Sequence, residues 1–161
     1  MVCVALQARG YEAHDMDLGY AAWVHRETGR TWPPDRPPDT DAPDWFERYE
    51  WRVVAEKVEA LAARAQQRMI FLAGMATNGH EVWHLFSRVI YLSIDEPTLR
   101  RRVASRTTND FGKTPNELAA ILELHEFAEA QHRRAGATII DATLPPEQVV
   151  DAVLDASLEP S

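Results

Sequence analysis

The stretch Met69-Ile70-Phe71-Leu72-Ala73-Gly74 is a short apolar run that stops at a glycine. An apolar run of this length, bounded by polar residues and glycine, is typical of a buried strand in a parallel sheet. Similar runs occur at 88–93 and 137–141, and polar, helix-forming segments separate the three. Strands that alternate with helices predict an α/β fold, in which helices cover both faces of a parallel sheet.

The N-terminal segment predicts a helix followed by a further strand. Residues 2–9 have a helical pattern, and Gly10 is a natural C-terminal residue for that helix. Residues 12–15 form a short strand, and the chain there closes on Asp15 and Asp17. Because ligands bind at the carboxyl ends of the strands in open parallel sheets, these two carboxylates are candidate functional groups.

The remaining segments predict a loop and several helices. Residues 31–43 are rich in proline and aspartate, so we expect a loop there. A long helix is expected over 45–67, because Trp45, Tyr49 and Val53 recur at helical spacing. Further helices are expected between and after the apolar strands, at 79–86, 95–106, 114–135 and from 145 onward.

Composition limits the classes of protein that fit the chain. With 161 residues, 45% of them hydrophobic, the chain can bury a core and is predicted to form a single domain over 1–161. Its 17 Lys and Arg residues against 25 Asp and Glu residues give a net charge of −8, which disfavours a nucleic-acid partner. The single cysteine, Cys3, and the lack of a signal peptide or a membrane span predict a cytoplasmic protein without a membrane partner.

Several short motifs follow one another along the chain in a characteristic order. They are Arg9-Gly10-Tyr11 with Asp15 and Asp17, then Trp51-Arg52, then Gly74 to Asn78, then Arg106 to Lys113, and finally Ile140 to Thr143. In order and spacing they resemble the P-loop nucleotide and shikimate kinase-like proteins, the adenylate kinase-like group. The resemblance extends from about Leu6 to Leu154 and implies a three-layer fold, with a parallel sheet of strand order 2-3-1-4-5 between helices.

In that family a strand and a Gly-x-x-x-x-Gly-Lys-Ser/Thr loop precede the first helix, and the loop holds the ATP phosphates. The resemblance therefore implies that this chain is N-terminally truncated and lacks the central first strand and its P-loop. We expect 12–15 to pair with 69–73 and 88–93 to pair with 137–141, with a slot between the two pairs. Unpaired strand edges at such a gap predict oligomers or aggregation.

The resemblance implies ATP-dependent phosphoryl transfer to a small metabolite or nucleoside-type acceptor in the complete form, with ATP and Mg²⁺ as cofactors, and no activity without the P-loop. Asp15 would orient or deprotonate the acceptor hydroxyl, and Asp17 would bind Mg²⁺ directly or through water. Arg52, Gly74 and Asn78 would line the acceptor site. The alternatives are that Asp17 caps a turn, that Gly74 and Asn78 form a plain turn, and that Arg52 forms a helical ion pair.

Two loops complete the predicted site. Residues 31–43 would cover the acceptor, and residues 107–113 would form a lid over the nucleotide. Arg102 and Arg106 would stabilise the transferred charge, and Arg106 and Lys113 would contact the nucleotide phosphates. The alternative for each of these basic residues is a solvated position on the surface.

Three other interpretations stay open. The chain is either a truncated kinase or a non-catalytic relative that binds a ligand or a partner. Residues 80–84, His-Glu-Val-Trp-His, match the zinc-hydrolase pattern in which two histidines bind metal and the glutamate activates water. The tryptophans of the first third either stack on an acceptor or belong to the core; these are Trp23, Trp32, Trp45 and Trp51.

Overall fold

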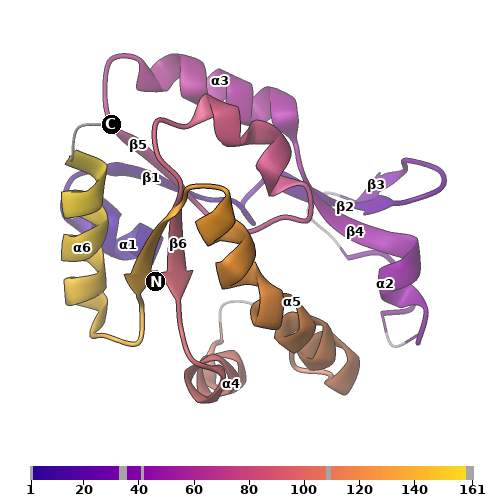
Figure 1. Cartoon of the computed structure of the whole chain (residues 1–161). Helices are drawn as coiled ribbons and strands as arrows, with labels where there is room; N and C mark the ends of the chain where they lie inside the picture. The colour runs from indigo at the N-terminus through magenta and orange to yellow at the C-terminus, as the bar shows by residue number, and fades with distance from the viewer. Residues whose placement is uncertain (1, 33–35, 41, 108–109, 159–161) are drawn as a thin grey trace. The chain divides into compact units, whose positions relative to one another are not determined.

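A computed structural model describes residues 2–32, 36–40, 42–107 and 110–158 (Figure 1). Its contacts divide the chain into two compact units, Met1–Ser87 and Arg88–Ser161, and each is described by itself. The expectations for 33–35 and 41 in the proline-rich loop, and for 108–109 in the lid, lie outside the described residues. The single-domain expectation stays a prediction.

The first unit contains a parallel pair of strands at its N-terminal side. Strand β1 (Glu12–Asp15) pairs with β5 (Ile70–Ala73), so that Glu12 lies opposite Ile70 and Asp15 opposite Ala73. Helix α1 (Val2–Ala8) contacts both strands, and Gly10 follows it with a φ of 85° that suits glycine. The predicted pairing of 12–15 with 69–73 is confirmed.

A three-stranded antiparallel sheet, absent from the sequence-based expectations, forms the rest of this unit. Its order is β3-β2-β4, and the strands are β2 (Ala21–His25), β3 (Thr31–Trp32) and β4 (Tyr49–Val53). The predicted helix over 45–67 is wrong, because its span holds α2 (Trp45–Arg48), then β4, then α3 (Ala55–Ala65). The predicted loop over 31–43 likewise begins with the short strand β3.

Aromatic packing holds this sheet together. The rings of Trp23 and Trp45 lie 4.6 Å apart and those of Trp23 and Trp51 5.3 Å apart. Trp45 is only 2% exposed, and its indole N–H donates to the Pro38 carbonyl over 3.2 Å. Trp23 and Trp45 are therefore core residues, and burial leaves neither ring free to stack on a ligand.

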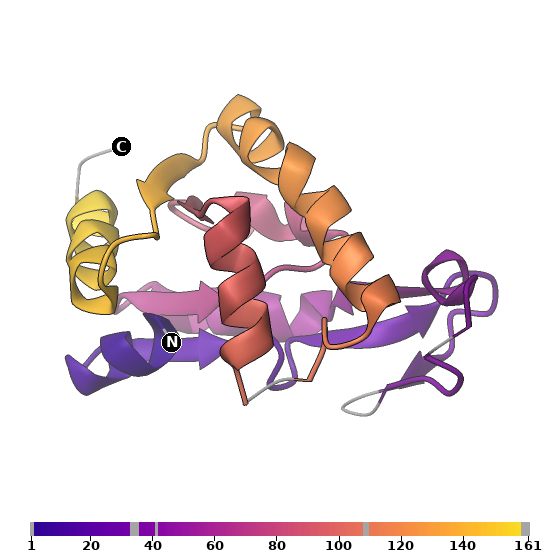
Figure 2. The same cartoon turned by 90° about the horizontal axis from the view of Figure 1, so that it is seen from below.

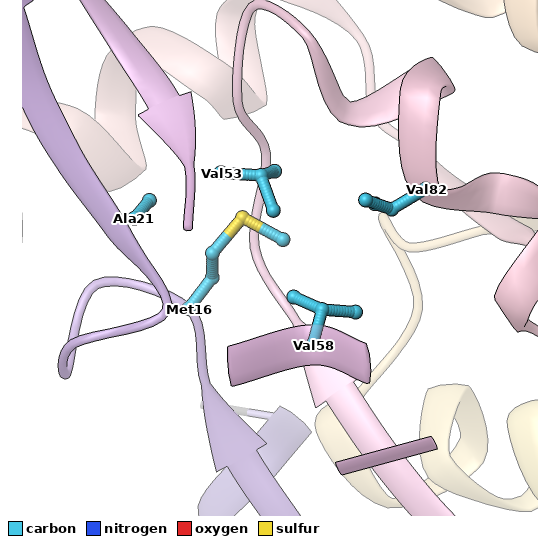
Figure 3. Packing of buried hydrophobic residues seen from close by; sticks show 5 residues of the cluster. All are labelled: Met16, Ala21, Val53, Val58 and Val82. Carbon is cyan, nitrogen blue, oxygen red and sulfur yellow. The ribbon is translucent and has the colours of Figure 1, made fainter. Parts of the chain in front are cut away.

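The core of the first unit centres on Met16, which follows β1 directly. Figure 3 shows its side chain extending toward Val53 and Val58, with Ala21 and Val82 around it. Gly74, just after β5, has a φ of 153°, and a Cβ at that position would overlap Met16 Cβ. Glycine is thus required at position 74 by close packing against the core.

The second unit contains the other parallel pair. Strand β6 (Ile90–Ser93) pairs with β7 (Thr138–Asp141), with Ser93 opposite Asp141, as the sequence predicted. Its helices, which can be followed in Figure 2, are α4 (Glu96–Ser105), α5 (Pro115–Arg134) and α6 (Pro146–Leu158). Asp95 caps α4 by accepting from the Thr98 N–H over 2.7 Å, and Thr114 and Glu117 form a capping box on α5.

The strands of the described residues form two parallel pairs and one antiparallel triple, so the expectation of a single central parallel sheet is wrong. Within that part of the chain, β5 pairs with no strand other than β1, and β6 with no strand other than β7. Every residue of β5 and β6 stays partly exposed, although their apolar sequences predicted buried strands. The expected slot between the two pairs depends on the placement of the units and stays a prediction. Among the described helices, none is long and apolar enough to cross a membrane.

Replacing Gly74 by Ala should lower the free energy of unfolding by about 3 kcal/mol, because the added methyl group overlaps Met16 and the backbone conformation disfavours a side chain. Gly29→Ala is the matched control, since Gly29 has a φ of 68° but nothing within 4 Å of an added Cβ. For this control we expect the free energy of unfolding to fall by about 1 kcal/mol. Urea denaturation followed by tryptophan fluorescence measures both, and equal losses would contradict the close packing at Met16.

Candidate functional site

The carboxyl end of the β1–β5 pair brings together three residues that the sequence singled out. Asp15 ends β1 opposite Ala73, Asp17 lies two residues further on, and Gly74 follows β5. The Met16 N–H donates to the Ala73 carbonyl over 2.8 Å, and the Asp17 N–H donates to Asp15 Oδ1 over 3.0 Å. These bonds hold both aspartates at the edge where parallel sheets bind ligands.

Asp15 is half-buried and lies on the side of helix α1. Burial raises the pKa of the Cys3 thiol, and the negative charge of Asp15 raises it further, which places the two side chains within electrostatic range. Asp17 is exposed. The Asp15 carboxylate therefore combines a partly protected position with an oxygen already fixed by the turn.

The two aspartates suit Mg²⁺ better than a metal that needs a full set of protein ligands. Within the described ranges no group of three or more His, Cys, Asp or Glu residues is placed to hold a metal ion. Mg²⁺ keeps several of its waters and binds proteins through one or two carboxylates. Asp15 and Asp17 fit that pattern.

A second cluster lies on β4 and the segment that follows β5. Asn78 is 6% exposed, its Oδ1 accepts from the Val53 N–H over 2.8 Å, and its Nδ2 donates to Glu81 Oε2 over 2.8 Å. The Thr77 N–H donates to the Trp51 carbonyl over 2.8 Å. Residues 77–78 thus cover the outer edge of β4, and Asn78 completes its hydrogen bonding.

Arg52 joins this cluster through two carboxylates. It donates to Glu50 Oε1 over 2.9 Å and to the Glu81 carboxylate over 3.3 Å, whereas the alternative from the sequence was an ion pair within a helix. The hydrogen bond to Glu50 raises the pKa of Arg52, and the Asn78 hydrogen bond, assisted by the charge of Arg52, lowers the pKa of Glu81. The structure therefore brings Arg52 and Asn78 together through Glu81, which the sequence marked only as part of the zinc pattern.

The basic residues predicted for phosphoryl transfer all donate to main-chain carbonyls of the second unit. Lys113 Nζ donates to the carbonyls of Val103, Ala104 and Arg106 over 2.6, 2.8 and 2.9 Å. Arg106 donates to the Phe111 carbonyl, and Arg102 donates to the Ala142 carbonyl over 2.6 Å. Lys113 thereby satisfies the last carbonyls of α4, where a cation is favourable.

The end of the predicted lid, residues 110–113, turns tightly against α4 and α5. Gly112 has a φ of 90°, and a Cβ there would lie 2.7 Å from Ile121 Cδ1 and 2.8 Å from Val103 Cγ1. Its N–H donates to Glu117 Oε2 over 2.8 Å, and Glu117 is only 2% exposed. In this arrangement residues 110–113 are part of the helix junction.

The segment 74–81 does not fit the phosphates of ATP. Gly74 and Gly79 have the spacing of the glycines in a phosphate-binding loop, but His80 and Glu81 stand where Lys and Ser/Thr are needed. The Gly79 N–H already donates to the Ala76 carbonyl over 3.0 Å. These residues therefore do not form a P-loop for ATP.

The His-Glu-Val-Trp-His segment does not form the helix that a zinc hydrolase uses. It lies in η1 (Gly79–Leu85), a 3₁₀ helix. With three residues per turn, His80 and His84 fall on different faces, because only residues three apart are aligned. Glu81 is held by Asn78 and Arg52 rather than directed at a water.

Comparisons with protein-family models, curated proteins and solved structures found no match to the chain. Any function assigned to it therefore rests on its own residues and their geometry.

Replacing Asn78 by Asp should lower the free energy of unfolding by about 2 kcal/mol at neutral pH, because a buried carboxylate would replace the N–H donor to Glu81. Repulsion from Glu81 raises the pKa of the new carboxyl in the folded state, so the penalty exists above that pKa. It should disappear as the pH falls below the unfolded value, about 3.9. Asn116→Asp, at an exposed site in the first turn of α5, is the control. Urea denaturation over a pH series measures the difference, and a constant penalty at all pH values would contradict the charge repulsion.

Replacing Lys113 by Met should lower the free energy of unfolding by about 1 to 2 kcal/mol, because three carbonyl acceptors at the end of α4 lose their charged donor. Arg100→Met is the control, since the ion pair of Arg100 with Glu96 on the same helix is exposed. Hydrogen exchange of the backbone amides in α4 and α5 measures this loss of stability and shows where in the unit it occurs. If the hydrogen-exchange rates of these amides are unchanged in the variant, Lys113 does not stabilise the end of α4 and is a solvated surface residue.

Proposed function

We propose that the complete form of this protein is an ATP-dependent small-molecule kinase of the P-loop nucleotide and shikimate kinase-like family. In this proposal the acceptor is a small metabolite or a nucleoside-type compound, and the P-loop is supplied by sequence outside the 161 residues. The two parallel pairs support it, because β1–β5 and β6–β7 are the neighbours expected in the order 2-3-1-4-5 when the first strand is absent.

The observation that carries the proposal is the position of Asp15 and Asp17. Both lie at the carboxyl end of a parallel strand pair, held by the turn that follows β1 and by the hydrogen bond from the Met16 N–H to the Ala73 carbonyl of β5. In that position the Asp15 carboxylate would accept the proton of an acceptor hydroxyl, and Asp17 would hold Mg²⁺ directly or through water. Magnesium would supply charge neutralisation on the phosphate oxygens.

The remaining predicted residues need a change of partner to take part. Arg52 would leave Glu50 to bind the acceptor, and Asn78 would keep Arg52 in place through Glu81. Lys113, Arg102 and Arg106 would exchange main-chain carbonyls for phosphate oxygens. Such an exchange is consistent with a lid that closes on a nucleotide.

The second candidate function is a non-catalytic relative that binds a ligand or a partner. The hydrogen bonds of Lys113 favour it, because three carbonyl acceptors within 2.9 Å occupy the cation in a structural role. In this alternative the basic residues stabilise the α4–α5 junction permanently and never contact a phosphate.

The coding sequence immediately upstream distinguishes the two functions, because an in-frame Gly-x-x-x-x-Gly-Lys segment is expected for the kinase. The protein extended to include it should transfer phosphate from ATP with Mg²⁺ to one of a panel of small hydroxyl compounds. Asp15→Asn should then lower kcat by about 10²-fold or more. The control is Asp155→Asn, at an exposed position of α6, which should keep the wild-type rate. Absence of the upstream motif, or equal rates for the two variants, would overturn the kinase proposal.

A further inference from the structure

The first unit contains a small pocket that neither Asp15 nor Asp17 lines. It has a volume of about 290 Å³ and lies between the turn after Asp17 and one face of helix α3. The turn contributes Leu18 and Tyr20, and α3 contributes Lys57, Ala60, Leu61 and Arg64. A volume near 300 Å³ is at the lower end of the range for small-molecule sites.

The pocket lies on the opposite side of β1 from Asp15. Tyr20 Oη lies 3.3 Å from His14 Nδ1, and the two rings are 5.4 Å apart, so His14 faces the pocket side. Successive side chains of a strand alternate between its two sides, so Asp15 faces away. A ligand in this pocket therefore does not occupy the proposed acceptor site.

Positive charge is in surplus at this pocket, although the protein carries a net charge of −8. Lys57 and Arg64 line it, and no lining residue is acidic. The nearest carboxylate partner is Glu12, which pairs with both Arg64 and Arg68 and also with His14. One carboxylate thus faces two guanidinium groups, and Lys57 adds a third cation.

Both lining cations have capacity for a ligand. Lys57 Nζ uses one N–H on the Gly19 carbonyl, over 2.7 Å, and an ammonium group has three. Arg64 can turn to a ligand while Arg68 and His14 keep Glu12 paired. The hydrogen bond from His14, followed by the charges of Arg64 and Arg68, holds the pKa of Glu12 below its usual value, so Glu12 stays ionised.

The space between the two cations is apolar. Ala60 lies between Lys57 and Arg64 on the same face of α3, because these positions are three and four residues apart. Leu61, which is 5% exposed, and Tyr20 also line the pocket. A carbon skeleton of a few atoms can cover this apolar area.

We propose that this pocket binds a small organic anion, whose phosphate or carboxylate group lies between Lys57 and Arg64 and whose carbon skeleton covers Ala60 and Leu61. The binding is independent of phosphoryl transfer and needs no ATP. It gives the first unit a second ligand site besides the aspartate edge.

The test is a titration of the isotope-labelled protein with glycerol 3-phosphate, propionate, inorganic phosphate and glycerol, followed by backbone NMR shifts. We expect saturable shifts at 18–20 and 57–64 with glycerol 3-phosphate, propionate or both, and weaker binding of inorganic phosphate. A dissociation constant of about 1 mM is expected, and none should be measurable for glycerol. Which of the two organic anions binds tighter identifies the preferred charged group.

Two variants on the same helix provide a matched pair. Ala60→Glu introduces a carboxylate into the pocket and should weaken binding at least about tenfold. Ala63→Glu adds the same charge to the same helix at an exposed residue that does not line the pocket, and it should leave the affinity within about twofold. Lys57→Gln should also weaken anion binding, and it is the test variant if Ala60→Glu fails to fold. Equal effects of the two glutamates, shifts with glycerol equal to those with the anions, or no saturation with any anion would overturn the proposal.

Discussion

The close approach of Met16 to Gly74 is the contact on which the first unit depends. Met16 leaves β1 and enters the core beside Ala21, Val53, Val58 and Val82, so one side chain connects the parallel pair, the antiparallel sheet and two helices. This is possible only because position 74 carries no side chain. The same turn sets Asp15 and Asp17 at the strand edge, so packing and the candidate chemistry have one structural origin.

Polar groups that the sequence assigned to the predicted site already have hydrogen-bond partners within their own units. Asn78, Arg52 and Lys113 each have short hydrogen bonds to backbone or carboxylate groups. A ligand must therefore replace existing bonds rather than fill empty ones, and the net gain of such an exchange is small for each bond. Binding that involves these residues consequently requires either a rearrangement of the loop at 110–113 or a ligand charge strong enough to compete.

Much of the architecture follows from local patterns. The strands at 12–15, 70–73, 90–93 and 138–141 and the caps at Asp95 and Thr114 were predictable, because apolar runs and capping residues act within a few residues of chain.

The helix predicted over 45–67 was wrong for a definite reason. Trp45, Tyr49 and Val53 lie four residues apart, a spacing that fits both a helix and the two-residue period of a strand. The alternation of Tyr49, Trp51 and Val53 with Glu50 and Arg52 was the signal for β4.

The sequence by itself determined the mixed α/β class and the presence of two aspartates after β1, since these depend on local periodicity and short-range order. The pairing of the four parallel strands was an implication of the family resemblance, which the structure bears out. Only the tertiary structure decided the partners of the polar side chains. Arg52 forms hydrogen bonds with Glu50 and Glu81, and Lys113 donates to carbonyls at the end of α4. It also placed Lys57 and Arg64 around one pocket. Such contacts depend on how segments distant in sequence fold against one another, and a long charged side chain has several acceptors within reach until packing selects among them.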